Sequence, residues 1–192
     1  MLTFTAARWV LVLHTALGVA AVGSGTHLVI WLRRYLGGAV GRRRAVLKFA
    51  WIFFALQLAA FGAGNLMYPT YKVEVRAAYL ENPGALASEQ AVRDRTLYEL
   101  ELKQHGEPRA MPATAELVKR AAQAARWFDV KEHWIALGLF ASAGLLLILV
   151  CWDPFADGRA FASIVTGLAW IACGTVWLGA VIGVLTAAWR AI

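Results

Sequence analysis

The sequence predicts an all-α integral membrane protein in which four transmembrane helices form a bundle. Of its 192 residues, 60% are hydrophobic and only 16% are charged, and the mean hydropathy is +0.57. These values are typical of a chain that contacts lipid, and they exclude a disordered chain and an ordinary water-soluble domain. Four uncharged stretches reach the roughly 18 residues that a helix needs to cross the hydrocarbon core. Six of the nine tryptophans lie at the predicted ends of these stretches, as in an interfacial aromatic belt.

Residues 1–71 are predicted to form the first transmembrane hairpin. Its two spans are residues 9–32, which are 24 uncharged residues, and residues 49–71, which are 23. The first span is longer than the apolar core of a signal peptide and is followed by two arginines, so we expect it to be retained. The second span is expected to continue outward as a helix after a kink at Pro69.

Residues 72–133 are predicted to form an extracytoplasmic helical segment. Ser88 is a favourable N-cap for a helix over residues 89–105. Thr114 is a favourable cap for the helix that follows. Residues 114–137 contain neither Gly nor Pro, so we expect the third transmembrane helix to begin well outside the membrane.

Residues 134–192 are predicted to form the second transmembrane hairpin. Its spans are residues 134–152, which are 19 uncharged residues, and residues 160–189, which are 30. The longer span is expected to tilt or to extend past the bilayer. Gly179 and Gly183 form a GxxxG pattern, which is typical of a helix-packing face.

Basic residues between the first two spans predict the orientation. This short loop and its flanks carry six positive and no negative charges, on Arg33, Arg34, Arg42, Arg43, Arg44 and Lys48. The positive-inside rule therefore predicts a cytoplasmic loop, both termini outside the cytoplasm, and a bacterial inner membrane as the location. The net charge of +7 and the pI near 9.9 indicate affinity for anionic lipid, and we expect no nucleic-acid partner.

Several self-contained chemistries are excluded by the sequence. The two cysteines are isolated and no CxxCH motif is present, so neither an iron–sulfur cluster held by this chain alone nor covalent haem is expected. The sequence contains no phosphate-binding glycine loop, no HExxH motif and no nucleophile elbow. It therefore favours a subunit of a larger oxidoreductase assembly over a self-contained enzyme.

Histidines in or beside the spans are the first candidate site. An ionisable residue in lipid is costly, which makes it a functional candidate. His14 and His133 are expected at similar depth near the outer surface, where two imidazoles could be axial ligands of haem b. Three small residues on the His14 face would let a flat macrocycle approach the helix: Gly18, Ala21 and Gly25. The architecture is similar to that of membrane cytochrome b subunits, although no family motif covers the chain.

Polar residues at the outer ends of the second and third spans are the second candidate site, for a quinone or a proton path. Tyr68, Tyr71 and Glu74 leave the second span, and Asp129 and Glu132 enter the third. A carboxylate at a low-dielectric boundary can exchange protons with a quinol headgroup held by a tyrosine. A salt-bridged collar that anchors the helix ends is the alternative. A metal site that includes these carboxylates lacks a recognisable ligand spacing.

Three functions are compatible with these patterns. The leading one is a membrane subunit of a redox complex that binds haem b, a quinone or both near the outer surface and relays electrons. The alternative is a non-catalytic anchor or assembly subunit that docks other protein subunits through its outer helices. A small transporter is the weakest, because the spans contain few polar residues. His27 lies about 140° around the helix from His14, so a second haem within this chain is not predicted.

Overall fold

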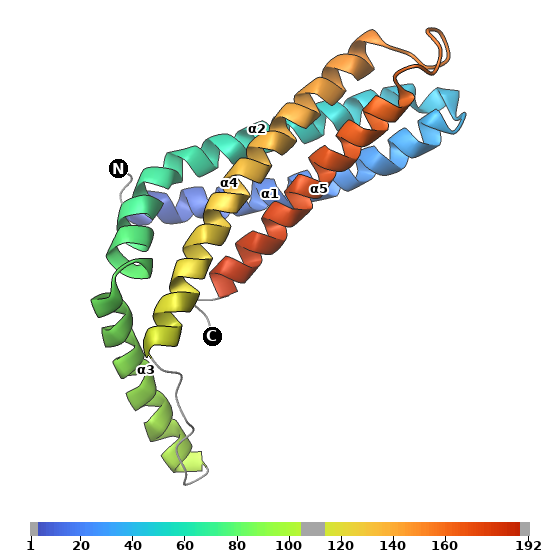
Figure 1. Cartoon of the computed structure of the whole chain (residues 1–192). Coiled ribbons are helices and arrows are strands. Elements are labelled where there is room, and N and C mark those ends of the chain that lie inside the picture. Colours follow the sequence, from blue (N-terminus) through green and yellow to red (C-terminus); the bar gives the residue numbers. More distant parts are fainter. Residues whose placement is uncertain (1–3, 105–113, 189–192) are drawn as a thin grey trace. The chain divides into compact units, whose positions relative to one another are not determined.

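The computed structural model describes residues 4–104 and 114–188, and these residues are helical with no β-strand among them (Figure 1). The five α-helices are α1 (Phe4–Leu36), α2 (Arg43–Thr70), α3 (Pro83–Gln104), α4 (Thr114–Cys151) and α5 (Ala162–Ala188). A short 3₁₀ turn, Val40–Arg42, precedes α2. Four segments are long and apolar enough to cross a membrane: Thr5–Leu36, Val40–Leu80, Ala115–Cys151 and Ala162–Thr186. The predicted all-α class and the four predicted spans are therefore confirmed.

The chain divides into two compact units. One comprises residues 68–128, and the other comprises the residues on either side of that range. The second unit contains most of the four spans and is called the bundle below. The first contains α3 and the neighbouring ends of α2 and α4, and it is called the polar unit.

The bundle is held by an apolar core to which all four spans contribute. Within it, α1 and α5 lie side by side along much of their length (Figure 1). The most completely buried large side chains of this core come from α1, α2, α4 and α5: Leu28, Leu32, Tyr35, Val46, Phe53, Leu145 and Val165. Burial of such side chains normally contributes about 1.5–3 kcal/mol each in water, but in lipid the contribution comes from close packing.

Glycines allow the helices of the bundle to approach closely. A Cβ on Gly25 would lie 2.6 Å from Cε2 of Phe53, so the α2 phenyl ring fills the space that the α1 glycine leaves. A Cβ on Gly179 would lie 2.5 Å from Cδ1 of Ile135, which confirms a packing role for this glycine of the GxxxG pattern. Such contacts replace the hydrophobic driving force that is absent between helices in lipid.

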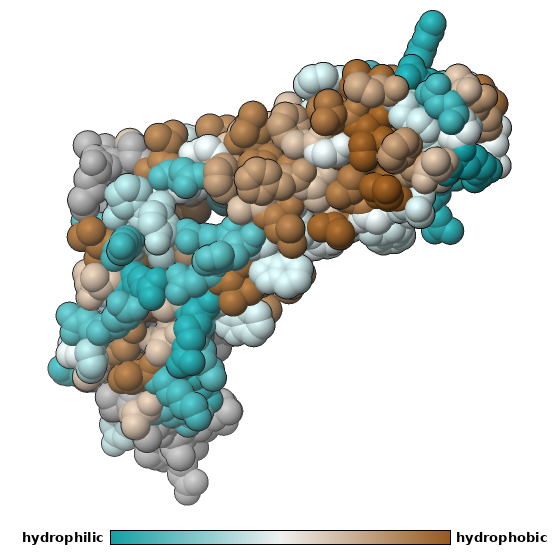
Figure 2. Space-filling view, turned by 45° about the horizontal axis from the view of Figure 1, so that its top comes forward, coloured by the Kyte–Doolittle hydropathy of each residue, from teal (hydrophilic) through white to brown (hydrophobic). Residues whose placement is uncertain are grey.

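The outer surface of the bundle is apolar. On the face drawn in Figure 2, hydrophobic residues cover much of the bundle. Large apolar side chains are exposed on every span, with Val19 at 69%, Leu66 at 65%, Phe140 at 77% and Val184 at 67% exposed. A soluble protein rarely exposes so continuous an apolar surface, so this chain is a multi-pass membrane protein in contact with lipid.

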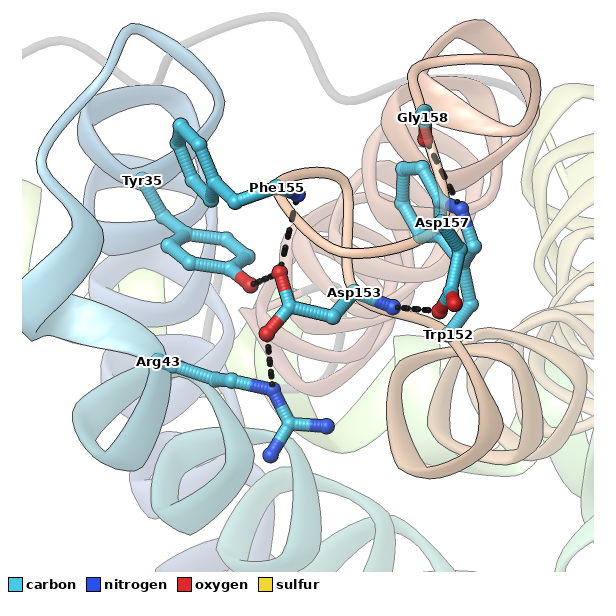
Figure 3. Close-up of polar contacts among 7 residues, drawn as sticks. All are labelled: Tyr35, Arg43, Trp152, Asp153, Phe155, Asp157 and Gly158. Carbon is cyan, nitrogen blue, oxygen red and sulfur yellow. Dashed lines mark hydrogen bonds and ion pairs between the residues drawn. The ribbon is translucent and has the colours of Figure 1, made fainter.

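A polar network joins the α4–α5 turn to the first hairpin (Figure 3). The Tyr35 hydroxyl donates to Oδ1 of Asp153 over 2.9 Å, and the Arg43 guanidinium pairs with Oδ2 over 3.1 Å. The backbone N–H of Phe155 also donates to Oδ1, over 2.9 Å. Arg159 donates to the carbonyl oxygen of Leu36 over 2.8 Å. One carboxylate therefore links α1, α2 and the turn before α5.

The polar unit begins where α2 passes Pro69. The backbone widens into a π-type helix, Tyr71–Leu80, whose last bonds include Glu81 N–H to Arg76 O over 2.8 Å. Proline removes one backbone donor from the helix, and the change of helix type follows it by two residues. The helical continuation that we predicted beyond Pro69 is confirmed.

The start of α3 differs from the prediction. The helix begins at Pro83, and the Asn82 side chain caps it by accepting from the backbone N–H groups of Gly84 and Ala85 over 3.1 and 3.2 Å. The predicted cap, Ser88, is wrong, because its hydroxyl donates to the carbonyl oxygen of Ala85 within the helix. Asn followed by Pro is a strong start signal, which the prediction overlooked. The predicted C-terminal residue of this helix, His105, lies outside the described residues.

Helix α4 confirms the prediction of a long continuous third helix, since it extends without a break from Thr114 to Cys151. Its first turns pack within the polar unit, where Ala121 and Ala125 are buried together with Leu80 and Leu86. These few side chains form a small core.

We predict that Gly138→Ala destabilises the bundle. A Cβ on this α4 residue would lie 2.9 Å from Cβ of Thr175 on α5 and would also collide with its hydroxyl oxygen. Overpacking of this kind costs about 1–3 kcal/mol, which should lower the thermal unfolding midpoint in detergent. Gly174→Ala is the matched control, because a Cβ there meets nothing within 4 Å among the described residues. An equal fall of the unfolding midpoint in both variants would contradict the predicted close approach of α4 and α5 at Gly138.

We also predict an acid-dependent contribution from Asp153. Donation by the Phe155 backbone, followed by the Tyr35 hydroxyl and the Arg43 guanidinium, holds the pKa of this carboxyl below its ordinary value of 3.8. Because the pKa is lower in the folded state, the stabilisation is fully present above 3.8 and is lost as the pH falls through the folded-state pKa. Thermal unfolding should be measured from about pH 7 to about pH 2. The unfolding midpoint of wild type should exceed that of Asp153→Asn at neutral pH, and the difference should disappear only at the acid end. A constant difference between them throughout would refute the linkage.

Candidate functional site

The His14 imidazole lies at the interface of α1 and α2. Its Nδ1 is 2.8 Å from the carbonyl oxygen of Ala60, and the side chain is half-buried. A Cβ on Gly64 would lie 3.3 Å from its Cε1, so the ring packs directly against α2 where this glycine leaves room. Because a carbonyl oxygen can only accept, Nδ1 carries the proton, and Nε2 is the ring nitrogen with an available lone pair.

Lys131 brings α4 and α5 to the same region of the bundle. This half-buried side chain reaches α5, where a Cβ on Gly183 would lie 3.2 Å from its Nζ. Its charge acts on His14, and the carboxylate of the neighbouring Glu132 acts on Lys131 in turn. His14 therefore contacts α2, and Lys131 of α4 contacts α5.

His133 has the same hydrogen-bonding pattern as His14. Its Nδ1 is 2.8 Å from the carbonyl oxygen of Asp129, one turn earlier on α4. The imidazole is exposed. Its Nε2 is therefore also the nitrogen that can accept a ligand.

The three small residues predicted to follow His14 have different surroundings. A Cβ on Gly18 would meet nothing within 4 Å among the described residues, so this position leaves open space. Ala21 is buried in the bundle core with 1% exposure. Gly25 is covered by the Phe53 ring. Of these three positions, only Gly18 therefore has open space beside it among the described residues.

The residues predicted for a quinone or proton site belong to the two different units. In the polar unit, the Tyr71 ring stacks on Phe128 with 3.9 Å between centroids and 18° between planes. Tyr68 is half-buried in this unit, and Glu74 is exposed. In the bundle, Asp129 and Glu132 are half-buried on α4. Among the described residues, no three His, Cys, Asp or Glu side chains form a group that could hold a metal ion.

His27 is placed differently from the other two described histidines. Its ring stacks on Phe49 of α2, with 5.5 Å between centroids and 27° between planes. The side chain is exposed on the surface of the bundle. A stacking role at the α1–α2 contact accounts for this residue without a ligand.

A second polar cluster in the bundle core was not predicted as a unit. The Ser142 hydroxyl donates to Oε1 of Gln57 over 2.5 Å, and Nε2 of Gln57 donates to the carbonyl oxygen of Ala172 over 3.5 Å. Thr175 is buried beside them and donates to the same carbonyl over 2.9 Å. Gln57 stands out in the sequence as an amide within an apolar span, but its partners come from residues 85 and 115 positions away.

Comparison with known proteins finds no matching protein family, curated protein or solved structure. The fold defines the class, a multi-pass helical membrane protein. The chemistry of the bundle interior must therefore be inferred from its own residues.

We predict that Gln57→Leu weakens the bundle because it removes the hydrogen bonds that link α2 to α4 and α5. Interhelical hydrogen bonds in membrane proteins are worth about 0.6 kcal/mol on average and up to about 1.7 kcal/mol. The unfolding free energy in mixed micelles should fall by an amount in that range. Asn65→Leu is the control, because among the described residues the Asn65 amide donates to the carbonyl oxygen of Phe61 on its own helix. A similar loss in the control would indicate a nonspecific effect of removing an amide.

Proposed function

We propose that this chain is a membrane subunit of a redox complex, which binds haem b through His14 and His133 and relays electrons near the outer surface. The observation that carries the proposal is the shared arrangement of these two imidazoles. Each holds Nδ1 at 2.8 Å from a backbone carbonyl oxygen. This arrangement leaves Nε2 of each ring to bind iron.

The hydrogen bond at Nδ1 is the usual outer partner of a metal-binding histidine. It determines the tautomer, restrains the ring and increases the basicity of the ligating nitrogen. For His14 the acceptor belongs to α2, so a second helix orients the ring. When bound, haem supplies one-electron transfer, and the protein orients it and adjusts its potential through nearby charges.

The surroundings of His14 support such a role. Open space at Gly18 suits a flat ligand on the same helix face, whereas Phe53 takes the space at Gly25. The charge of Lys131 acts on His14, and a nearby cation favours the reduced form of a redox group. The residues that would approach the ligand are therefore His14, Gly18 and Lys131 in the bundle.

A quinone is the second cofactor that this proposal includes. Two separate sets of groups would bind it or exchange its protons. One set is Tyr68, Tyr71 and Glu74 within the polar unit, and the other is Asp129 and Glu132 within the bundle. The arginine-rich loop between α1 and α2 supports a cytoplasmic location for that end of the bundle. The histidines would then lie toward the periplasmic side of a bacterial inner membrane.

A specific observation favours the second candidate function, a non-catalytic anchor or assembly subunit. Helix α3 leaves large apolar side chains exposed from its middle to its C-terminal end, with Val92 at 68%, Tyr98 at 49%, Leu100 at 48% and Leu102 at 52%. Apolar side chains on a helix outside the membrane are typical of a protein-binding surface. In this role, α3 would dock another subunit, and the histidines would only pack the helices.

We predict that reduced-minus-oxidised absorption spectra of the detergent-purified chain contain the sharp alpha band of a bis-histidine haem. His14→Ala and His133→Ala should each lower the haem content at least about tenfold, because each removes one of two iron ligands. His27→Ala is the matched control and should retain the band, since its ring stacks on Phe49.

A featureless spectrum from folded wild-type protein would reject the haem proposal. If His14→Ala and His133→Ala then assembled normally, the anchor function would be favoured. Substitution of Val92 and Leu102 by serine should in that case release co-purifying subunits.

A further inference from the structure

The end of α1 gathers two guanidinium groups around one indole ring. The guanidinium carbon of Arg34 lies 5.4 Å from the centroid of the Trp31 ring, and that of Arg42 lies 4.6 Å from the same centroid. Because both distances share one point, the two carbons are at most about 10 Å apart. Trp31 is half-buried, and both arginines are exposed. Two cations therefore lie within cation–π distance of one indole ring at the surface of the bundle.

The positive charge at this location has little internal compensation. Of the two carboxylates in the α4–α5 turn, Asp153 is engaged by Arg43 and by the Tyr35 hydroxyl, and Asp157 accepts from the backbone N–H of Asp153. The adjoining residues Arg33, Arg44 and Lys48 add three further positive charges. Like charges held close together repel one another, and a bound anion would offset that repulsion.

The depth of this cluster in the bilayer suggests which anion it binds. Trp31 lies near the end of the apolar segment Thr5–Leu36, where an indole marks the interface, and the arginines follow it. Arg42 immediately precedes α2. Lipid phosphates lie at this level, and arginine binds phosphate oxygens through two parallel N–H donors. Ile30 at 42%, Val40 at 56% and Trp51 at 55% exposure provide apolar contacts for acyl chains.

We propose that Trp31, Arg34 and Arg42 form a binding site for the phosphate group of an anionic phospholipid. The net negative headgroup is preferred because a zwitterionic lipid would bring its own ammonium close to Arg34, Arg42 and the adjoining basic residues. Free phosphate shares the ligand chemistry but lacks the acyl chains that the neighbouring apolar side chains would contact. The site does not depend on the proposed haem or quinone function.

The test is lipid retention by the full-length chain, measured by native mass spectrometry after delipidation in detergent. Phosphatidylglycerol and phosphatidylcholine are added separately at equal concentration. Wild type should retain phosphatidylglycerol at least about tenfold more strongly, as expected for paired charge-assisted contacts. Arg34→Gln/Arg42→Gln should remove most of this preference.

Arg33→Gln/Arg44→Gln is the matched control, because it removes the same charge from the same region and leaves the Trp31 pair intact. It should lower retention by less than about twofold, since only screened surface charge is lost. Equal loss in both double variants would overturn the proposal in favour of diffuse attraction. Equal retention of the two lipids by wild type would also overturn it.

Two further measurements separate a lipid site from a free-phosphate site and allow for a variant that does not fold. Inorganic phosphate in millimolar excess should not displace phosphatidylglycerol, and displacement would identify a free-phosphate site instead. If Arg34→Gln/Arg42→Gln fails to fold, Arg34→Lys/Arg42→Lys retains the charge but loses the planar fork. We expect it to weaken retention severalfold, and unchanged retention would contradict the site.

Discussion

The absence of water from the hydrocarbon core is the constraint on which the structure depends. Every backbone N–H and C=O group within the spans must bond inside its own helix, so helices are the form that the uncharged stretches adopt. Lipid also removes the hydrophobic drive that would press helices together. The bundle therefore depends on close contacts, such as Phe53 in the space left by Gly25 and Ile135 against Gly179.

The same constraint explains the arrangement of polar groups. Buried polar side chains in the spans have partners from other helices, as Gln57 has in Ser142 and His14 has in the carbonyl of Ala60. At the end of the bundle, Asp153 supplies a further link to Tyr35 and Arg43. These few directional contacts determine the rotation of each helix about its axis, which apolar packing alone specifies weakly.

Much of the fold could be predicted from the sequence, because charge spacing and helix-breaking residues act locally. Gaps between charges located the four spans, and the absence of Gly and Pro predicted the continuous α4. The geometry of the candidate site could not be predicted to the same extent. The sequence singled out His14 and Gly25 but could not show their partners. The carbonyl oxygen of Ala60 accepts from His14, and the Phe53 ring covers Gly25. Both partners lie on α2, and periodicity within α1 contains no information on the rotation of a neighbouring helix.

The polar network around Asp153 also constrains the order of biosynthesis. Tyr35 and Asp153 are 118 positions apart, and Arg43 leaves the ribosome long before its carboxylate partner is made. The first hairpin must therefore enter the membrane with this tyrosine and arginine still hydrated or bound to headgroups. Only when the α4–α5 turn has been translated can the carboxylate replace those temporary partners. Closure at this end of the bundle is consequently a late event in assembly, and a chain that stops before residue 153 cannot complete it.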